Sequence, residues 1–414
     1  MSVEGLGIAR ADKLVIFVKG MIKGEEADVK IIAEKKNYSI GIIDKLIEAS
    51  PYRIGSECPI AYKCGGCDYR HISYDYQLQL KKEVLINTFP GYKVNDILPC
   101  KDPYYYRNKV QIPVSDHKMG FYRKFSNDIV EFDDCLIESK AANAMIRDLK
   151  SLILNTEKER SIRHILIKHG KGSGEVMLAF IVNDLSVDLS DICGFMVKKY
   201  PEIVSVLMNL NDRKTNVILG TEEVLLYGRD YIYDVFDGIR VKVSLKSFYQ
   251  VNHDQMIRLY DTARRLADLD KDKEVLDLYC GIGTISLYLS RFVKHVTGVE
   301  IVESAVRNAK DNAGLNQIDN CDFILADATK DMDPYLKNKD VVILDPPRKG
   351  VGRKLIDSLK ENRIEKIVYI SCNPATLARD LELLKDDYEI GEIYPVDMFP
   401  FTIHTECVTV LDHK

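Results

Sequence analysis

The pattern of apolar and polar positions divides the chain into three regions, of which the first spans residues 1–50. Apolar and polar side chains alternate over residues 13–19 and 26–32, with Gly20 and Gly24 between these segments. This alternation predicts the strands of a small antiparallel barrel or meander. A barrel of this size could bind RNA or could cap the following domain, and the pattern is compatible with both roles.

The second region, residues 51–245, is predicted to be a mixed α+β domain. The spacing of its apolar residues predicts a helix over 74–89. Residues 160–235 alternate as strands. Near the end of the region, two alternating segments are joined by Asp237-Gly238, which is typical of a hairpin with a two-residue turn.

The third region, residues 246–414, is predicted to be an α/β domain with a Rossmann-like sheet. Asn252 is placed as the N-cap of its first helix, and Gln255 follows three residues later, as in a capping box. From residue 274 onward, strands alternate regularly with helices, as they do in an open parallel sheet.

The composition of the chain bears on its cellular location and on its binding partners. The chain has 414 residues, of which 46% are hydrophobic and 29% charged, and no apolar run approaches the length of a membrane span. Its first residues lack the features of a signal peptide, so we expect a cytoplasmic protein with no membrane partner. The net charge of −5 means that local basic patches would have to bind any nucleic acid.

Three of the ten cysteines, Cys58, Cys64 and Cys67, lie close together in the sequence, and Cys135 is the best candidate to join them. In a reducing compartment, clustered cysteines favour metal binding over disulfides. Four thiolates without a nearby histidine could hold a zinc ion or an iron–sulfur cluster. The irregular triplet favours the cluster, because zinc sites usually use two short Cys pairs; three unrelated buried cysteines remain the alternative.

A basic and aromatic stretch follows over residues 101–125. Up to residue 124 it has six cations and two carboxylates, which leaves a local charge of +4. The cations are Lys101, Arg107, Lys109, Lys118, Arg123 and Lys124, and the interleaved rings are Tyr104, Tyr105, Tyr106, Phe121, Tyr122 and Phe125. Cations that contact phosphates, mixed with rings that stack on bases, predict an RNA surface; a solvated sheet edge with packed tyrosines is the alternative.

Four carboxylates lie at or near the ends of successive predicted strands of the third region. These are Asp277, Glu300, Asp327 and Asp345. Because the carboxyl ends of parallel strands meet at one edge of a sheet, we expect a common ligand crevice there. The carboxylates suit a cofactor that carries a nucleoside and a cationic centre, as S-adenosylmethionine does.

The loop that follows Asp277 contains Gly281 and Gly283, which would let a ligand approach the backbone closely. It is not the dinucleotide fingerprint, because Tyr279 takes the place of the first glycine and the third glycine is absent. This difference counts against NAD as the cofactor.

A β-branched strand over residues 368–371 ends in Cys372 and a turn that contains Pro374. An open sheet delivers side chains to its ligand at such a point, so Cys372 could be a nucleophile. Taken alone, a free cysteine is better explained as a small buried hydrophobe.

Five ordered motifs resemble the RNA uracil-C5 methyltransferases, specifically the branch that acts on 23S rRNA. They are Phe248-x-Gln250-x-Asn252, Asp277-Leu-Tyr-Cys-Gly-Ile-Gly283, Asp345-Pro-Pro-Arg-Lys-Gly350, Ser371-Cys372-Asn373-Pro374 and His404-Thr405-Glu406. Residues 5–10 also resemble part of the N-terminal TRAM barrel of that family. The strand that usually precedes this stretch is missing, so we expect either an incomplete barrel or a start that lies upstream.

The resemblance implies roles for individual residues. Cofactor binding is assigned to Gln250, Tyr279, Thr284, Glu300, Asp327 and Asp345. Cys372 corresponds to the nucleophile and Glu406 to the proton-accepting base. The ligands of a four-iron, four-sulfur cluster correspond to Cys58, Cys64, Cys67 and Cys135. A cluster has no redox step to perform in this chemistry, so we expect it to be structural or to position RNA.

The implied reaction starts with addition of the Cys372 thiolate to C6 of a flipped-out uridine, which makes C5 nucleophilic. We expect this thiolate to form near neutral pH, helped by an exposed strand-end position. Glu406 would remove the C5 proton after methyl transfer. Arg107 and the neighbouring tyrosines are candidates for holding the RNA strand.

Other functions remain open at this point. Members that methylate the T-loop uridine of tRNA usually lack the cluster, which favours 23S rRNA, but the tRNA reaction stays an alternative. A catalytically inactive iron–sulfur protein that binds RNA or senses redox state is a second one. Adenine-N6 methylation is disfavoured, because Arg348 stands where those enzymes usually have a stacking aromatic residue. We expect a monomer.

Overall fold

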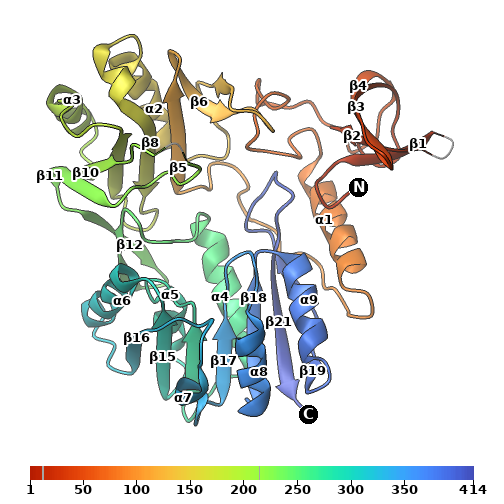
Figure 1. Cartoon of the computed structure of the whole chain (residues 1–414), viewed down its shortest axis with the longest axis vertical. Coiled ribbons are helices and arrows are strands. Elements are labelled where there is room, and N and C mark those ends of the chain that lie inside the picture. The colour runs from red at the N-terminus through yellow and green to blue at the C-terminus, as the bar shows by residue number, and fades with distance from the viewer. Residues whose placement is uncertain (12–13, 214) are drawn as a thin grey trace.

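The structure is a computed structural model that describes residues 1–11, 14–213 and 215–414. Figure 1 shows a small sheet beside the N-terminus, a larger sheet above and an α/β layered unit below, which ends at the C-terminus.

The N-terminal residues form a four-stranded sheet in the order β1-β2-β4-β3. The strands are β1 (Gly7–Ala11), β2 (Leu14–Lys19), β3 (Glu26–Glu34) and β4 (Tyr38–Glu48). Lys13, with which the alternating segment 13–19 begins, lies outside the described residues. Strand β4 lies between β2 and β3. It pairs with β3 in the antiparallel direction and with β2 in the parallel direction. The expectation of a wholly antiparallel module is therefore wrong for this pair.

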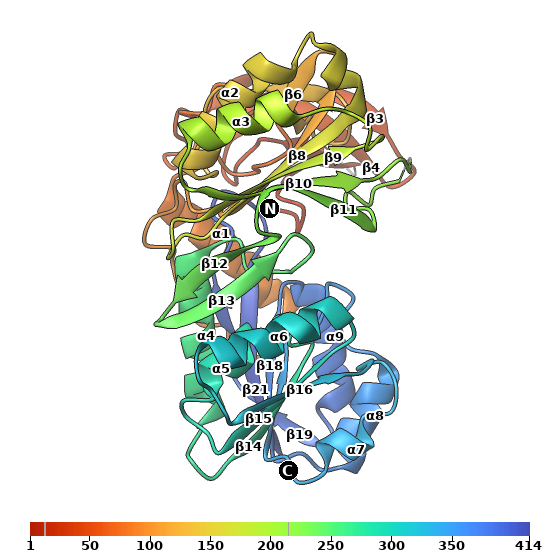
Figure 2. The same cartoon turned by 90° about the vertical axis from the view of Figure 1, so that its left-hand side faces the viewer.

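A seven-stranded sheet in the order β11-β10-β9-β8-β5-β6-β7 forms the centre of the chain. Its strands are β5 (Lys109–Ser115), β6 (Lys118–Tyr122), β7 (Ile129–Glu131), β8 (Ile162–His169), β9 (Val176–Val182), β10 (Ile203–Leu210) and β11 (Glu222–Gly228). The associated helices are α2 (Lys140–Ile153), α3 (Ser190–Lys199) and the 3-10 helix η1 (Glu157–Ser161). Helices α2 and α3 cover one face of this sheet (Figure 2). They contribute Met145 and Met196 to its core. Helix α3 corrects the prediction of strands throughout residues 160–235.

The predicted hairpin is present as β12 (Tyr231–Phe236) and β13 (Ile239–Ser244). Its turn residues Asp237 and Gly238 have φ values of 45° and 79°, as the tight hairpin turn requires. The hairpin lies between the two large sheets, since β12 contacts β9 and β10 whereas β13 contacts α6 (Figure 2).

The C-terminal unit is an eight-stranded, mainly parallel sheet with helices on both faces. Its strands are β14 (Glu274–Leu278), β15 (His295–Glu300), β16 (Cys321–Leu325), β17 (Val341–Leu344), β18 (Lys366–Ser371), β19 (Tyr388–Ile390), β20 (Tyr394–Val396) and β21 (Glu406–His413). They follow the order β16-β15-β14-β17-β18-β21-β19, and β20 pairs with β21. The predicted α/β fold class is therefore confirmed.

Helices cover this sheet according to the alternation of its side chains. One face packs against α4 (His253–Ala267), α5 (Thr284–Leu289) and α6 (Glu303–Leu315), and the other against α7 (Asp333–Leu336), α8 (Arg353–Glu361) and α9 (Pro374–Leu384). Neighbouring residues of β14 show the alternation, since Val275 joins the first core and Leu276 the second. None of the described helices combines the length and apolar character needed to span a bilayer.

Helix α1 (Tyr74–Thr88) agrees with the predicted helix but packs far from its neighbours in sequence. It lies beside α9 of the C-terminal unit (Figure 1). Leu85 and Phe89 share a core with Leu377 and Leu381 of that helix. The chain thus crosses to the C-terminal unit before it builds the central sheet.

Asn252 is the N-cap of α4, as predicted, because its Oδ1 accepts a hydrogen bond from the Gln255 amide at 3.3 Å. The reciprocal half of the predicted capping box is absent. The Gln255 side chain instead donates to the carbonyl oxygens of Leu98 and Asp397. The Asn252 amide also donates to the Met398 carbonyl at 3.2 Å, so this cap ties α4 to the chain before β21.

We expect Asn252→Ala to lower the free energy of unfolding by about 2 kcal/mol, because it removes a helix cap and leaves the buried Met398 carbonyl without this donor. Urea unfolding measures the change. Ser73→Ala is the matched control, since Ser73 precedes α1 at the same position but makes no side-chain cap bond. Equal effects of the two substitutions would contradict the assignment of the cap.

Candidate functional site

The loops at one edge of the C-terminal sheet gather the candidate residues into a row. The strand order β16-β15-β14-β17-β18-β21 places them in the sequence Asp327, Glu300, Tyr279, Asp345, Cys372 and Glu406. Glu406 joins this edge with the first residue of its strand, because β21 runs antiparallel to β18. The crevice expected from the sequence is therefore formed by residues that are up to 127 positions apart.

The glycine loop after β14 has the backbone of a ligand-binding turn. Tyr279, Gly281 and Gly283 have φ values of 68°, 56° and 82°. A Cβ atom at Gly283 would lie 2.8 Å from the ring of Phe323, so only glycine fits there. Tyr279 adopts the left-handed conformation in the place where a dinucleotide site has its first glycine.

Glu300 holds this loop and the start of the following segment. Its Oε2 accepts a hydrogen bond from the Gly281 amide at 3.1 Å, and its Oε1 accepts from the amides of Ile301 and Val302 at 2.9 Å. Carboxylate oxygens have further lone pairs, so these contacts leave Glu300 able to accept from a ribose hydroxyl.

The remaining predicted cofactor residues lie around the same edge. The Thr284 hydroxyl is 2.8 Å from the hydroxyl of buried Tyr260. Gln250 is buried, and its backbone carbonyl accepts from Asn108. Asp327 accepts from the Thr329 amide and hydroxyl, which lower the pKa of its carboxyl group.

Asp277 differs from the other carboxylates of the row, because it lies inside β14 and is fully buried. Its Oδ2 accepts from the Ser286 hydroxyl of α5 at 2.5 Å, while its Oδ1 has no partner. Burial raises its pKa to about 7. Asp277 therefore ties β14 to α5 through Ser286 and is not at the strand end where the sequence placed it.

Cys372 and Glu406 are adjacent across the sheet. The register of β18 and β21 pairs Ser371 with Cys407, so the next residues on the two strands are Cys372 and Glu406. Glu406 is 3% exposed, whereas Cys372 is half-buried. In the sequence, Cys372 and Glu406 were identified as a functional pair by the resemblance of five motifs together, and not by any single motif.

The electrostatic environment of the pair favours the protonated forms. Burial and the charge of Asp345 raise the pKa of Glu406 to about 8. Burial, Glu406 and Asp345 together raise the pKa of Cys372 to about 11. The expectation of a ready thiolate at neutral pH is therefore wrong for this state of the protein. Arg348 opposes the shift at both groups and is the cation that favours their charged forms.

A cavity of about 290 Å³ opens beside Cys372. Its lining comes from six parts of the chain: Val3, Tyr69, the α1 face, Arg348, residues 372–375 after β18 and residues 403–405 before β21. Sequence reasoning assigned no role to Arg348, although it stands in the Asp345-Pro-Pro-Arg motif. It also missed the α1 contribution, for which the local pattern gave no signal.

The four predicted cluster cysteines line a second cavity, of about 220 Å³. Cys58, Cys64, Cys67 and Cys135 all lack disulfide bonds. The amide side chain of Asn143 bonds the backbone N–H and C=O of Cys135, which fixes that residue. Gly65 packs so closely on β6 that a Cβ atom would lie 2.9 Å from the Tyr122 carbonyl oxygen.

The chemistry of this cavity is that of buried thiols beside cations. Burial raises the pKa of Cys67, and it raises the pKa of Cys135 to about 12. Arg70, Arg107 and Lys109 lie in the same lining and would offset negative charge there. Within residues 1–11, 14–213 and 215–414, no His, Cys, Asp or Glu side chains are grouped as ligands of a single metal ion.

The predicted RNA surface is divided between the interior and the outside. Arg107 lines the four-cysteine cavity, where its Nε lies 3.4 Å from Glu138, and Tyr106 is 3% exposed. Tyr106 is therefore not part of an open RNA surface, which corrects the sequence interpretation for that residue, whereas the Arg107 side chain keeps 28% of its surface exposed. Tyr122 and Phe125 remain outside, with 42% and 87% of their surface exposed.

Comparison with known proteins agrees with this geometry. The family model described as tRNA (Uracil-5-)-methyltransferase matches residues 73–414, and the TRAM domain model matches residues 2–43. A protein named RNA methyltransferase from Bacillus cereus is 39% identical over 431 residues, which cover 99% of this chain and 94% of that protein. A protein of the same name from Halalkalibacterium halodurans is 38% identical and covers 99% and 95% of the two chains.

A solved structure extends the likeness to three dimensions. The Pyrococcus abyssi tRNA (uracil-54, C5)-methyltransferase in complex with S-adenosyl-L-homocysteine has a TM-score of 0.82 and 28% identity. The likeness covers 99% of this chain and 98% of that one. The chain therefore belongs to the tRNA (uracil-5-)-methyltransferase family, and it is an S-adenosylmethionine-dependent RNA methyltransferase with an N-terminal TRAM domain.

Proposed function

We propose that the protein methylates C5 of a specific uridine in 23S rRNA through a covalent adduct between Cys372 and C6 of the base. The observation that carries this proposal is the adjacency of Cys372 and Glu406 across β18 and β21, where Cys372 and the three residues before Glu406 line one cavity. A nucleophile and a base on neighbouring strands are what addition at C6 and proton removal at C5 require.

The proposed cofactor residues are Gln250, Tyr279, Thr284, Glu300, Asp327 and Asp345. The donor set fits S-adenosylmethionine, because Glu300 retains acceptor capacity for ribose and Asp345 is desolvated enough to raise its pKa to about 7. A positive sulfonium near Asp345 and Glu406 would offset this buried negative charge. When bound, the cofactor supplies the electrophilic methyl group.

The chain's own residues perform the other steps. The Cys372 sulfur forms a bond to C6, and the electrons of the C5–C6 double bond move into the C4 carbonyl as an enolate. After C5 has gained its methyl group, Glu406 takes the C5 proton. The double bond then re-forms, and the sulfur leaves C6 with the electrons of the S–C6 bond, so that Cys372 is restored.

Two features bear on which RNA is modified. The resemblance associates four cluster cysteines with 23S rRNA enzymes, and all four line one cavity in this chain. The solved relative, in contrast, acts on uracil-54 of tRNA and shares the fold over the whole chain. The T-loop uridine of tRNA is therefore the second candidate substrate. The third candidate is a catalytically inactive RNA-binding or redox-sensing protein. The adjacency of Cys372 and Glu406 argues against it.

We propose that the second cavity holds a four-iron, four-sulfur cluster on Cys58, Cys64, Cys67 and Cys135. The four half-buried thiols that line one cavity suit such a cluster, and the neighbouring guanidinium groups of Arg70 and Arg107 would balance its charge. A cluster also spreads its thiolates more widely than one ion does, so it does not need the geometry of a single-metal site. The proposed role of the cluster is structural.

We further propose that the protein is a cytoplasmic monomer with domains over residues 1–50, 51–245 and 246–414.

The substrate is tested by transfer of tritiated methyl groups from labelled S-adenosylmethionine to protein-free 23S rRNA and to unmodified tRNA, with anaerobically purified protein. We expect label in 23S rRNA, recovered as 5-methyluridine. Label in tRNA alone would keep the reaction but replace the substrate. Absence of label in both RNAs would favour the inactive alternative.

We expect Cys372→Ala to abolish both methyl transfer and the covalent adduct with RNA that contains 5-fluorouridine, because Cys372 is the one cysteine among the described residues that lines this cavity. Gel shift under denaturing conditions detects the adduct. Cys193→Ala, in the central unit, is the control and should retain both methyl transfer and the adduct.

Glu406→Gln should accumulate a methylated adduct, since the C5 proton cannot be removed. Normal turnover in this variant would exclude Glu406 as the base.

The alkylation rate of Cys372 should rise with pH through the range 7–10, because the thiolate reacts and the pKa lies near 11. We expect Glu406→Gln to increase this rate several-fold at pH 8. Loss of the neighbouring negative charge lowers the pKa of the thiol, and each unit gives about tenfold more thiolate. Iodoacetamide labelling with mass spectrometry of the Cys372 peptide measures the rate.

The exposed carboxylate Glu382 on α9 provides the control for that experiment. Glu382→Gln should leave the alkylation rate of Cys372 unchanged. A rate that is unchanged or lower in Glu406→Gln would contradict the charge coupling between Cys372 and Glu406.

A further inference from the structure

The segment from Asp397 to Thr405, here called the 397–405 loop, connects β20 to the first residue of β21. It has no regular secondary structure, and Phe401 adopts a left-handed backbone with φ of 65°. Ile403, His404 and Thr405 line the cavity of Cys372, and Glu406 follows directly. The position of the proposed base therefore depends on what holds this loop.

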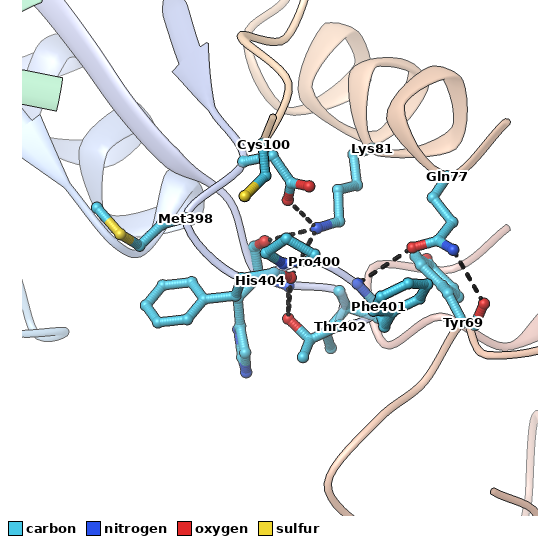
Figure 3. Close-up of polar contacts among 12 residues, drawn as sticks. Tyr69, Gln77, Lys81, Cys100, Met398, Pro400, Phe401, Thr402 and His404 are labelled. Carbon is cyan, nitrogen blue, oxygen red and sulfur yellow. Dashed lines mark hydrogen bonds and ion pairs between the residues drawn. The ribbon is translucent and has the colours of Figure 1, made fainter. Parts of the chain in front are cut away.

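Lys81 of α1 holds the loop at both of its ends (Figure 3). Its ammonium group donates to Asp397 Oδ1 at 2.5 Å and to the carbonyl oxygens of Phe399 and His404, each at 3.1 Å. All three donors of the ammonium are thus used. The side chains of Lys81 and Asp397 are both 1% exposed, so these bonds form away from solvent.

Two more residues on the same face of α1 contact the loop. The Gln77 amide donates to the carbonyls of Tyr69 and Ile72, while its Oε1 accepts from the Phe401 amide at 3.1 Å (Figure 3). The Tyr74 hydroxyl donates to Asp397 Oδ2 at 2.7 Å. Positions 74, 77 and 81 follow one another at helical spacing, so one rigid face of α1 binds the loop.

The segment after Cys67 closes on the loop through Phe401. The amides of Asp68 and Tyr69 both donate to the Phe401 carbonyl, at 2.9 and 3.0 Å. The Arg70 guanidinium lies 4.0 Å from the centre of the Phe401 ring. Both polar groups of the Phe401 backbone and its ring are therefore bound, which fixes a conformation that a non-glycine residue rarely adopts.

We propose that Lys81 is a positioning residue for methyl transfer. It holds the 397–405 loop so that His404, Thr405 and Glu406 keep their positions around the uracil ring of the substrate. This inference depends on the proposed roles of Cys372 and Glu406. Lys81 also lines the cavity of Cys372, but the loop uses all three of its N–H donors, so we place it outside the groups that contact the reacting atoms. It acts through two loop carbonyls and one carboxylate, whose positions set the wall of the cavity.

A pair of variants separates positioning from simple stability. Lys81→Met leaves Asp397 buried without its cation, so this variant should have a lower melting temperature. In Lys81→Met with Asp397→Asn the unpaired charge is removed, and the melting temperature should return toward that of the wild type. The carbonyls of Phe399 and His404 stay released in both variants.

We expect the double variant to keep a kcat about 100-fold below that of the wild type, because displacement of reacting groups by about 1 Å has effects of that size. Its affinity for S-adenosylhomocysteine and its KM for RNA should change little. Hydrogen exchange of the 397–405 amides should be faster than in the wild type. Lys82→Met is the matched control, since Lys82 is the next residue and makes a surface ion pair with Asp96.

Recovery of both kcat and melting temperature in the double variant would show that Lys81 is merely structural and would overturn the proposal. Unchanged hydrogen exchange of the loop would overturn it as well, whatever RNA the protein methylates. If Cys372→Ala still methylates RNA, the proposed mechanism fails, and that outcome is independent of the exchange result for Lys81.

Discussion

The antiparallel pairing of β21 with β18 is the constraint on which the reaction site depends. In a parallel sheet, neighbouring strands both end at the ligand edge, so neither can begin there. The reversed strand β21 begins at that edge, and its register sets Glu406 next to Cys372. A slip of one residue would turn Glu406 to the opposite face of the sheet. Buried Val408 and Leu411, which lie on opposite faces, oppose such a slip, since it would exchange their cores.

The charge balance at this edge of the sheet links binding of the cofactor to release of the proton from the Cys372 thiol. Glu406, Asp345 and Asp277 are carboxylates whose pKa values are raised by burial, and the first two also raise the pKa of Cys372. In the protein without ligands, these shifts favour the protonated form of the Cys372 thiol near neutral pH. A cationic cofactor at the same carboxylates would reverse the sign of the local potential. Nucleophile activation and cofactor binding then follow from one electrostatic change.

The parts of the fold that sequence could predict are those that local chemistry determines. The hairpin at Asp237-Gly238, the Asn252 cap and the strand–loop–helix order of the C-terminal unit depend on nearby residues. Contacts between distant segments gave no such signal. Gln255 bonds a carbonyl 142 residues away instead of its own helix start, and Arg107 lines the four-cysteine cavity. The protonated state of Cys372 was missed for the same reason, because Glu406 approaches it only through the sheet.

Phe401 joins the two cavities of the protein physically. Its ring packs in one apolar cluster with Tyr106 and Ile137, against which Cys67 and Cys135 also pack. Its backbone belongs to the loop that ends at Glu406. A group bound by the four cysteines would fix Cys67 and the three residues after it, which bind the Phe401 carbonyl and ring. The proposed cluster would therefore affect methyl transfer without an electron-transfer step, because the segment that it would order is one of the two supports of the 397–405 loop.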